Sequence, residues 1–109
     1  MALEKVINCT ILNGQTKSEA IRTGYKSSLV ALITPAALTG TTFTFEASVD
    51  GTTFAPVYNE ATLYSLTVST SRYIALNLSV FAGAQNIKVV SGSAEAGDRQ
   101  IALVVREVY

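Results

Sequence analysis

Histidine and tryptophan are both absent from this chain of 109 residues, and cysteine occurs once, as Cys9. Without histidine, the chain lacks the commonest general base and the commonest metal ligand, so neither a Ser-His-Asp triad nor a Cys-His pair can form. A single cysteine excludes an intrachain disulfide and, in the absence of histidine, the usual zinc sites. We therefore predict that the chain is not an enzyme and has no catalytic residue, no metal site and no cofactor.

The acidic residues are the remaining candidates for chemistry, and most of them fall in turns or near the ends of predicted strands. The two carboxylates of residues 93–98 are too few for a calcium loop. The glycines are scattered singly, so no phosphate-binding loop is predicted. We predict that the following residues are solvated surface charges: Glu4, Glu19, Glu60, Glu95, Asp98 and Glu107.

Charged residues are scarce, at 15% of the chain, and eight Lys+Arg balance eight Asp+Glu. A nucleic-acid-binding protein needs surplus cations to displace the counterions of the phosphates, so nucleic acid is not an expected partner. Neither a membrane-spanning run nor the apolar stretch of a signal peptide is present, so we expect no membrane contact and folding in a cytosol. Because hydrophobic residues reach 49%, we expect part of the apolar surface to face other chains.

Strict alternation of apolar and polar residues gives the clearest structural signal, over residues 42–49. Phe43, Phe45, Ala47 and Val49 fall on one face of the predicted strand, and the turn-forming pair at residues 50–51 follows it. Further strands are predicted at residues 5–12, 18–22, 29–33, 64–68, 72–76, 87–90 and 99–108. The last run is apolar on both faces, which predicts a central strand.

This spacing of short strands and turns predicts one all-β domain over residues 1–109. We expect an antiparallel β-sandwich, jelly-roll-like, with about seven to nine short strands. The only predicted helical turn spans residues 78–83. Cys9 lies among apolar residues of a predicted strand and is expected to be a buried thiol.

The turn after residue 49 has the pattern S-x-D-G-x-x-aromatic. Asp50 can accept hydrogen bonds from backbone amides, Gly51 tolerates positive φ, and Phe54 can fold back onto the core, so we predict a structural turn. The hairpin resembles one in discoidin-like and other carbohydrate-binding jelly rolls, which leaves a ligand-contacting loop as the alternative. Because Tyr64 and Tyr73 lie inside predicted strands, the tyrosines free to contact a sugar are predicted to be Tyr25, Tyr58 and Tyr109.

Four segments together, residues 33–40, 43–54, 72–76 and 87–93, resemble small bacteriophage virion proteins of the head-decoration or cement type. The resemblance covers most of the chain, roughly from residue 24 to residue 108, and includes no catalytic motif. It implies a β-sandwich that sits as a dimer or trimer on an assembled capsid, with the major capsid protein as partner. The virion, assembled in the host cytoplasm, is then the expected location. A tail, fibre or baseplate role and a carbohydrate-binding module are the alternatives.

Three surfaces are predicted to contact neighbours. Residues 1–12 could extend as an arm, or be exchanged, and add a strand to a neighbour's sheet. The loop at residues 34–39 is rich in apolar side chains, and the turn at residues 80–81 could present an aromatic anchor. The alternative is that the apolar side chains of the loop and turn plug the open ends of the sandwich. The candidate interface residues are Leu3, Val6, Ile7, Pro35, Leu38, Val80 and Phe81.

Overall fold

The computed structural model describes residues 4–24, 27–81 and 84–107, and within them it contains eleven strands and one short helix. Five of the strands have only two residues each, so the longer strands form the framework. The elements are β1 (Glu4–Ile11), β2 (Ile21–Arg22), β3 (Ser27–Ile33), β4 (Thr42–Ser48), β5 (Ala55–Pro56), β6 (Tyr58–Asn59), β7 (Thr62–Leu63), β8 (Leu66–Thr67), β9 (Tyr73–Ala75), α1 (Leu78–Phe81), β10 (Asn86–Ser91) and β11 (Arg99–Glu107).

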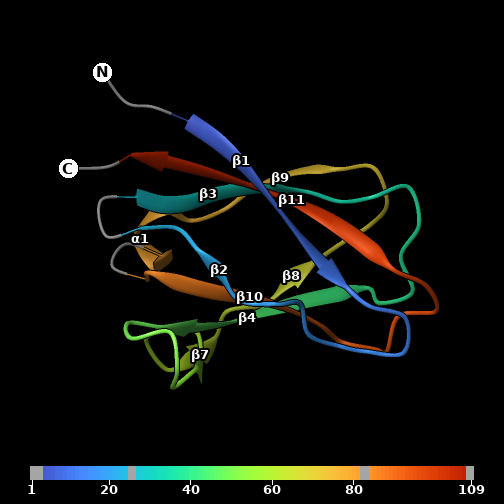
Figure 1. Ribbon diagram of the computed structural model, residues 1–109, viewed down its shortest axis with the longest axis horizontal. Helices are drawn as coiled ribbons and strands as arrows, with labels where there is room; N and C mark the ends of the chain where they lie inside the picture. The colour runs from blue at the N-terminus through green and yellow to red at the C-terminus, as the bar shows by residue number, and fades with distance from the viewer. Residues whose placement is uncertain (1–3, 25–26, 82–83, 108–109) are drawn as a thin grey trace.

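Two antiparallel sheets pack face to face as a β-sandwich (Figure 1). The first sheet has the order β1-β11-β3-β9, and the second has the order β2-β10-β4-β5, with β8 also pairing with β4. The chain crosses from one sheet to the other after β1, β2, β3, β8, β9 and β10. These crossings and the strand orders of the two sheets are those of a jelly roll. β11 lies between β1 and β3, so the prediction of a central last strand is confirmed.

The core lies between the inward faces of the sheets. In the first sheet one inward row runs across all four strands, and in the second sheet the apolar set of β4 faces it. The rings of Phe45, Tyr64 and Phe81 contact one another, with centroids 5.0 to 6.1 Å apart, and thereby link α1 to β4. The inward row of the first sheet consists of Ile7, Leu103, Leu32 and Ile74.

The predicted alternation of β4 fails at its end. Val49 is 74% exposed, whereas Ser48 is buried. The strand ends at Ser48 because its hydroxyl accepts hydrogen bonds from the backbone N–H groups of Asp50 and Gly51, which turns the chain before Val49 can face the core. Phe54 also departs from prediction, since it stays half-buried outside the core, with Lys88 Nζ 4.5 Å from the centre of its ring.

The predicted arm lies within the chain's own sheet over residues 4–11. β1 pairs with β11 in an unbroken register from Glu4 opposite Arg106 to Ile11 opposite Arg99. Cys9 and Ile11 point into the core and are fully buried, so this part of the segment does not extend from the domain. Leu3 lies outside the described residues.

Candidate interaction surface

On the outward side of the first sheet, two adjacent rows of side chains are apolar across all four strands, and the rows that flank them are polar or charged. Val6, Ile33 and Tyr73 are 58%, 38% and 64% exposed there. The strand register places them in two adjacent rows in which asparagine is the only polar residue. We call these two rows the apolar outer face: Asn8, Ala102, Ile33 and Tyr73 in one row, and Val6, Val104, Ala31 and Ala75 in the other. Val104 and Ala31 are covered by their neighbours, at 7% and 1% exposed, so Val6, Ile33 and Tyr73 supply most of the exposed apolar surface.

The outward side of the second sheet is different, because charged groups cover it. Lys17 Nζ lies 2.8 Å from a carboxylate oxygen of Glu46 on β4, and Lys88 of β10 lies over the ring of Phe54. Strands of a sandwich normally turn polar residues toward water. The second sheet follows that rule, whereas the two middle rows of the first sheet do not, so the apolar outer face is the candidate surface for contact with another protein.

The predicted interface residues outside β1 are half-buried or buried. Phe81 is fully buried, which corrects the prediction that it could be an exposed anchor. Leu38 and Val80 are half-buried and pack against the core, and Pro35 is half-buried. The geometry of Leu38, Val80 and Phe81 is that of side chains that close the sandwich, because the open ends of the two sheets would otherwise expose the core.

The tyrosines are distributed differently from the prediction. Tyr73 lies in a strand but points outward, and its side chain is the most exposed of the large apolar residues of the first sheet. Tyr64 is half-buried against Phe45 and Phe81, and its hydroxyl accepts a hydrogen bond from the N–H of Asn77. Tyr58 is 56% exposed on the β6–β7 hairpin. Tyr25 and Tyr109 lie outside the described residues.

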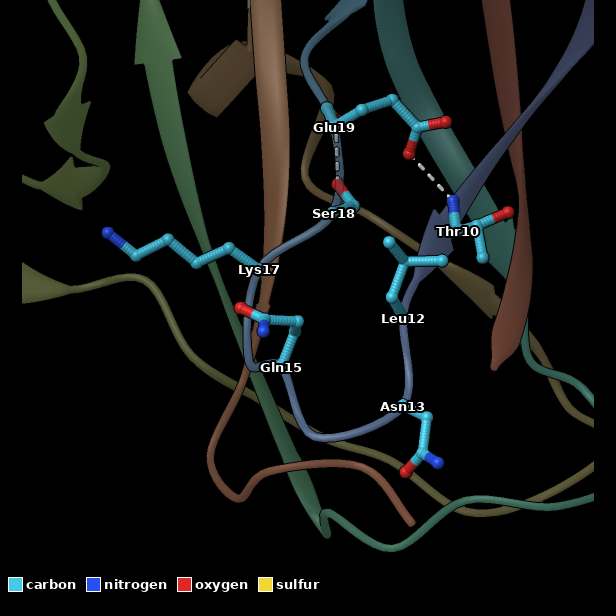
Figure 2. Close-up of a pocket in the computed structure, with 7 residues that line it drawn as sticks. All are labelled: Thr10, Leu12, Asn13, Gln15, Lys17, Ser18 and Glu19. Carbon is cyan, nitrogen blue, oxygen red and sulfur yellow. Dashed lines mark hydrogen bonds between the residues drawn. The ribbon is translucent and has the colours of Figure 1, made fainter. Parts of the chain in front are cut away.

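A groove of about 460 Å³ lies where β1 ends and the chain turns back toward β2. Figure 2 shows Leu12 on one limb of this turn facing the gap, while Lys17 on the other limb points away from it. Glu19 Oε1 accepts a hydrogen bond from the backbone N–H of Thr10 at 2.7 Å, and the Ser18 hydroxyl donates to the Glu19 carbonyl. The side chains of Glu19, Ser18 and Lys17 are thus already bonded within the chain.

Glu95 is a buried carboxylate, which corrects the prediction that it is a solvated charge. It is 1% exposed and accepts four hydrogen bonds of 2.8 to 3.0 Å, from the backbone N–H groups of Thr39 and Gly40, the Ser91 hydroxyl and Arg99 Nε. Burial by itself raises the pKa of Glu95, but these hydrogen bonds outweigh burial and lower the pKa. Glu95 therefore links the loop between β10 and β11, where it lies, to the loop of Thr39 and Gly40 between β3 and β4.

Asp50 organises the turn between β4 and β5. Its Oδ1 accepts hydrogen bonds from the backbone N–H groups of Thr53 and Thr52, at 2.9 and 2.8 Å, and from the Ser48 hydroxyl. These bonds stabilise the ionised form and lower the pKa of Asp50 to about 2. Gly51 has a φ of 80°, which a residue with a side chain adopts only with strain. The geometry is that of a structural turn.

Within the described residues, no group of three or more His, Cys, Asp or Glu side chains is placed to hold a metal ion. No helix in the described ranges has the length and hydropathy needed to cross a membrane.

Comparison with known proteins gives a likeness of fold. No protein-family model matches this chain, and no curated protein matches it in sequence. Among solved structures, the SPBc2 prophage-derived protein YomS is similar over 96% of both chains, with a TM-score of 0.58 and 14% identity. A protein of disulfide-linked pili that form Bacillus endospore appendages has a TM-score of 0.54 and 11% identity, over 98% of this chain and 88% of its own.

A third similar structure shows how widely this fold is used. Peruvianin-I, a cysteine peptidase from Thevetia peruviana latex, matches 97% of this chain with 55% of its own, at a TM-score of 0.51 and 10% identity. Identities this low show a shared fold alone, and one fold serves many functions. The function must therefore be argued from the surface of this chain.

Sequence reasoning found Val6 but missed the rest of the apolar outer face. Two signals for it are present in the sequence. Residues 99–108 are largely apolar on both faces, and Tyr73 and Ala75 are apolar while Ile74 between them takes the inward face. Neither signal shows that the outward residues of separate strands form one surface, because the pairing of β9 with β3 joins segments about 40 residues apart.

Proposed function

We propose that this chain is a non-enzymatic structural protein of a phage particle, and that it decorates or cements a capsid by contacting neighbouring capsid subunits. The apolar outer face is the observation that carries the proposal, since it covers four strands and has no charged residue in either row. A protein that assembles into an array needs such a surface and needs no reactive group. The likeness in fold to a prophage-derived protein supports the same class.

The fold suits this role because its rigid parts frame the contact surface. The longest strand, β11, has nine residues and lies in the middle of the first sheet, so the apolar outer face is held by main-chain pairing on both sides. The zero net charge also removes long-range repulsion between copies packed closely on a shell. The major capsid protein is the expected partner.

Quantitative mass spectrometry of purified particles from the source tests this proposal. A copy number comparable to that of the major capsid subunit is the expected result. A few copies per particle would instead indicate a tail, fibre or baseplate component. Absence from particles would contradict any virion role and direct attention to sugar binding at Tyr58, to be examined on a glycan array.

Particle binding by purified variants tests the surface itself. Tyr73→Asp places a charge at the β9 end of the apolar outer face and is expected to reduce co-sedimentation with particles at least about tenfold, because the charge would have to be desolvated. Val49→Asp is the matched control, since Val49 is 74% exposed at the opposite sheet. Equal binding by both variants would show that another surface makes the contact.

A further inference from the structure

The two sheets have four edges, and among the described residues only one of these is long. β9 has three residues, while β2 and β5 have two each, and β5 contains Pro56, which cannot donate a main-chain hydrogen bond. Short edge strands and edge prolines are the usual protections against pairing with another chain. β1 has eight residues, pairs with β11 in a register without a bulge, and contains no proline. It is the edge left able to accept a strand.

Only the first part of this edge is open. At its end, the Thr10 N–H donates to Glu19 Oε1, on the side away from β11, and Ile11 forms a bridge with Ser18. Main-chain groups in a strand point to its two edges alternately. The N–H and C=O groups of Glu4, Val6 and Asn8 therefore also point away from β11. We call residues 4–8 the open edge.

We propose that two copies of this chain pair through the open edge, antiparallel and about a two-fold axis at Val6. Val6 of each copy lies opposite Val6 of the other, and Glu4 of each lies opposite Asn8 of the other. These three pairs exchange about six main-chain hydrogen bonds. The first sheets, of four strands each, join into one sheet of eight.

Charge and hydrogen bonding select this register. A shift of one copy by two residues would bring Lys5 opposite Lys5, and a shift by four residues would bring Glu4 opposite Glu4. Like charges directly opposite each other are destabilising. Moving one copy the other way brings Glu4 opposite Thr10, whose N–H is already bonded to Glu19. In the proposed register the amide of Asn8 can donate to the carboxylate of Glu4, and Lys5 lies opposite Ile7.

The pairing also extends the candidate interaction surface. Val6 and Asn8 belong to the two rows of the apolar outer face, so the faces of the two copies become continuous across the axis. The inference is independent of the phage proposal, because it rests on the edge of β1 alone. It specifies how the predicted homo-oligomer would form.

The first test is the association state of purified protein, measured by sedimentation equilibrium over a wide concentration range. Wild type is expected to form dimers. Val6→Pro removes an N–H that points away from β11, so the sheet within each copy keeps its hydrogen bonds. The dissociation constant of the dimer is expected to rise at least about tenfold. Val6→Thr keeps the N–H and the β-branch, and its dissociation constant is expected to stay within about threefold. A wild type that is monomeric throughout, or a folded Val6→Pro variant that dimerises normally, overturns the proposal.

A charge exchange tests the register without a proline. Asn8→Glu places two carboxylates opposite each other across the axis, and the dissociation constant is expected to rise at least about fivefold. Adding Glu4→Lys to that variant is expected to restore association. Residues 4 and 8 of one chain are about 13 Å apart along a strand, so restoration requires contact between copies. Failure to restore association in a folded double variant overturns the register, and particle mass spectrometry is unaffected by either outcome.

Discussion

The carboxylate of Glu95 joins two loops that are far apart in the sequence, because its backbone donors Thr39 and Gly40 precede it by 56 and 55 residues. Gly40 must be glycine for this arrangement, since a Cβ there would collide with the Ser91 hydroxyl. Arg99 adds an ion pair whose carboxylate is fully buried. A buried charge with this many hydrogen bonds stabilises a fold only while every partner is present.

We expect Glu95→Gln to lower the free energy of unfolding by about 2 to 4 kcal/mol. Both carboxylate oxygens accept hydrogen bonds, so the NH₂ group that replaces one of them would face a donor and leave it without an acceptor. Urea denaturation at pH 7 measures the loss. Glu60→Gln is the control, since Glu60 is exposed in a turn. If Glu95→Gln lowered the free energy of unfolding no more than Glu60→Gln, the hydrogen bonds to the Glu95 carboxylate would not contribute to stability.

The carboxylates of Asp50 and Glu95 make stability depend on pH. The pKa of Asp50 in the folded protein is lowered from 3.8 to about 2, and that of Glu95 is also lowered. A carboxyl with a depressed folded pKa stabilises the fold above its unfolded pKa, and loses this contribution as pH falls through the folded pKa. Stability is therefore expected to fall from about pH 5 to pH 2. Asp50→Asn should flatten the part of the urea-measured profile below about pH 4, and an unchanged slope there would contradict the assignment.

At the scale of elements, alternation predicted the strands that are long enough to show it. The central parts of β4 and β11 have an apolar side chain at every second position, and the structure confirms both strands. β2 and β8 lie within the predicted strands at residues 18–22 and 64–68 but have only two residues each. β5, β6 and β7 also have two residues each and were not predicted, because a strand this short shows no period in the sequence. The burial of Glu95 could not be predicted because two of its four donors, the backbone N–H groups of Thr39 and Gly40, come from 56 and 55 residues away in the sequence.

The turn that follows β4 provides a test of local backbone chemistry. Gly51→Ala is expected to lower the free energy of unfolding by about 1 to 2 kcal/mol, because its positive φ strains a residue with a Cβ. The added Cβ meets nothing closer than 3.7 Å, so the loss isolates backbone strain. Gly51→Asn is the comparison, since asparagine tolerates this conformation better. Equal thermal stability of the two variants would contradict the strain argument.

For the whole molecule, the two sheets enclose a core that solvent does not reach, and Cys9 reports on that closure. The thiol is fully buried, and burial raises its pKa to about 12. Because the thiolate is the reactive form, labelling requires the sandwich to open. The cysteine is thus an internal probe of how often β1 leaves its place beside β11.

Labelling of Cys9 at pH 8 is expected to be more than about a thousandfold slower in the folded protein than in urea. Thiol-reactive dye uptake measures both rates. Val49→Cys supplies an exposed thiol in the same chain and should label at the rate of a free cysteine. Rapid labelling of Cys9 itself would show that β1 detaches readily, as an exchanged strand would.

The pairing of Glu4 with Arg106 has a consequence for connectivity. The start of β1 and the end of β11 lie side by side at one end of the sandwich (Figure 1). A short linker between these ends would make an ordinary β-hairpin of β11 and β1, and the chain could then be opened at the exposed turn between Glu60 and Ala61. A circular permutant made in this way would keep every strand pairing. Cargo fused before β1 or after β11 would emerge from the same end of the sandwich.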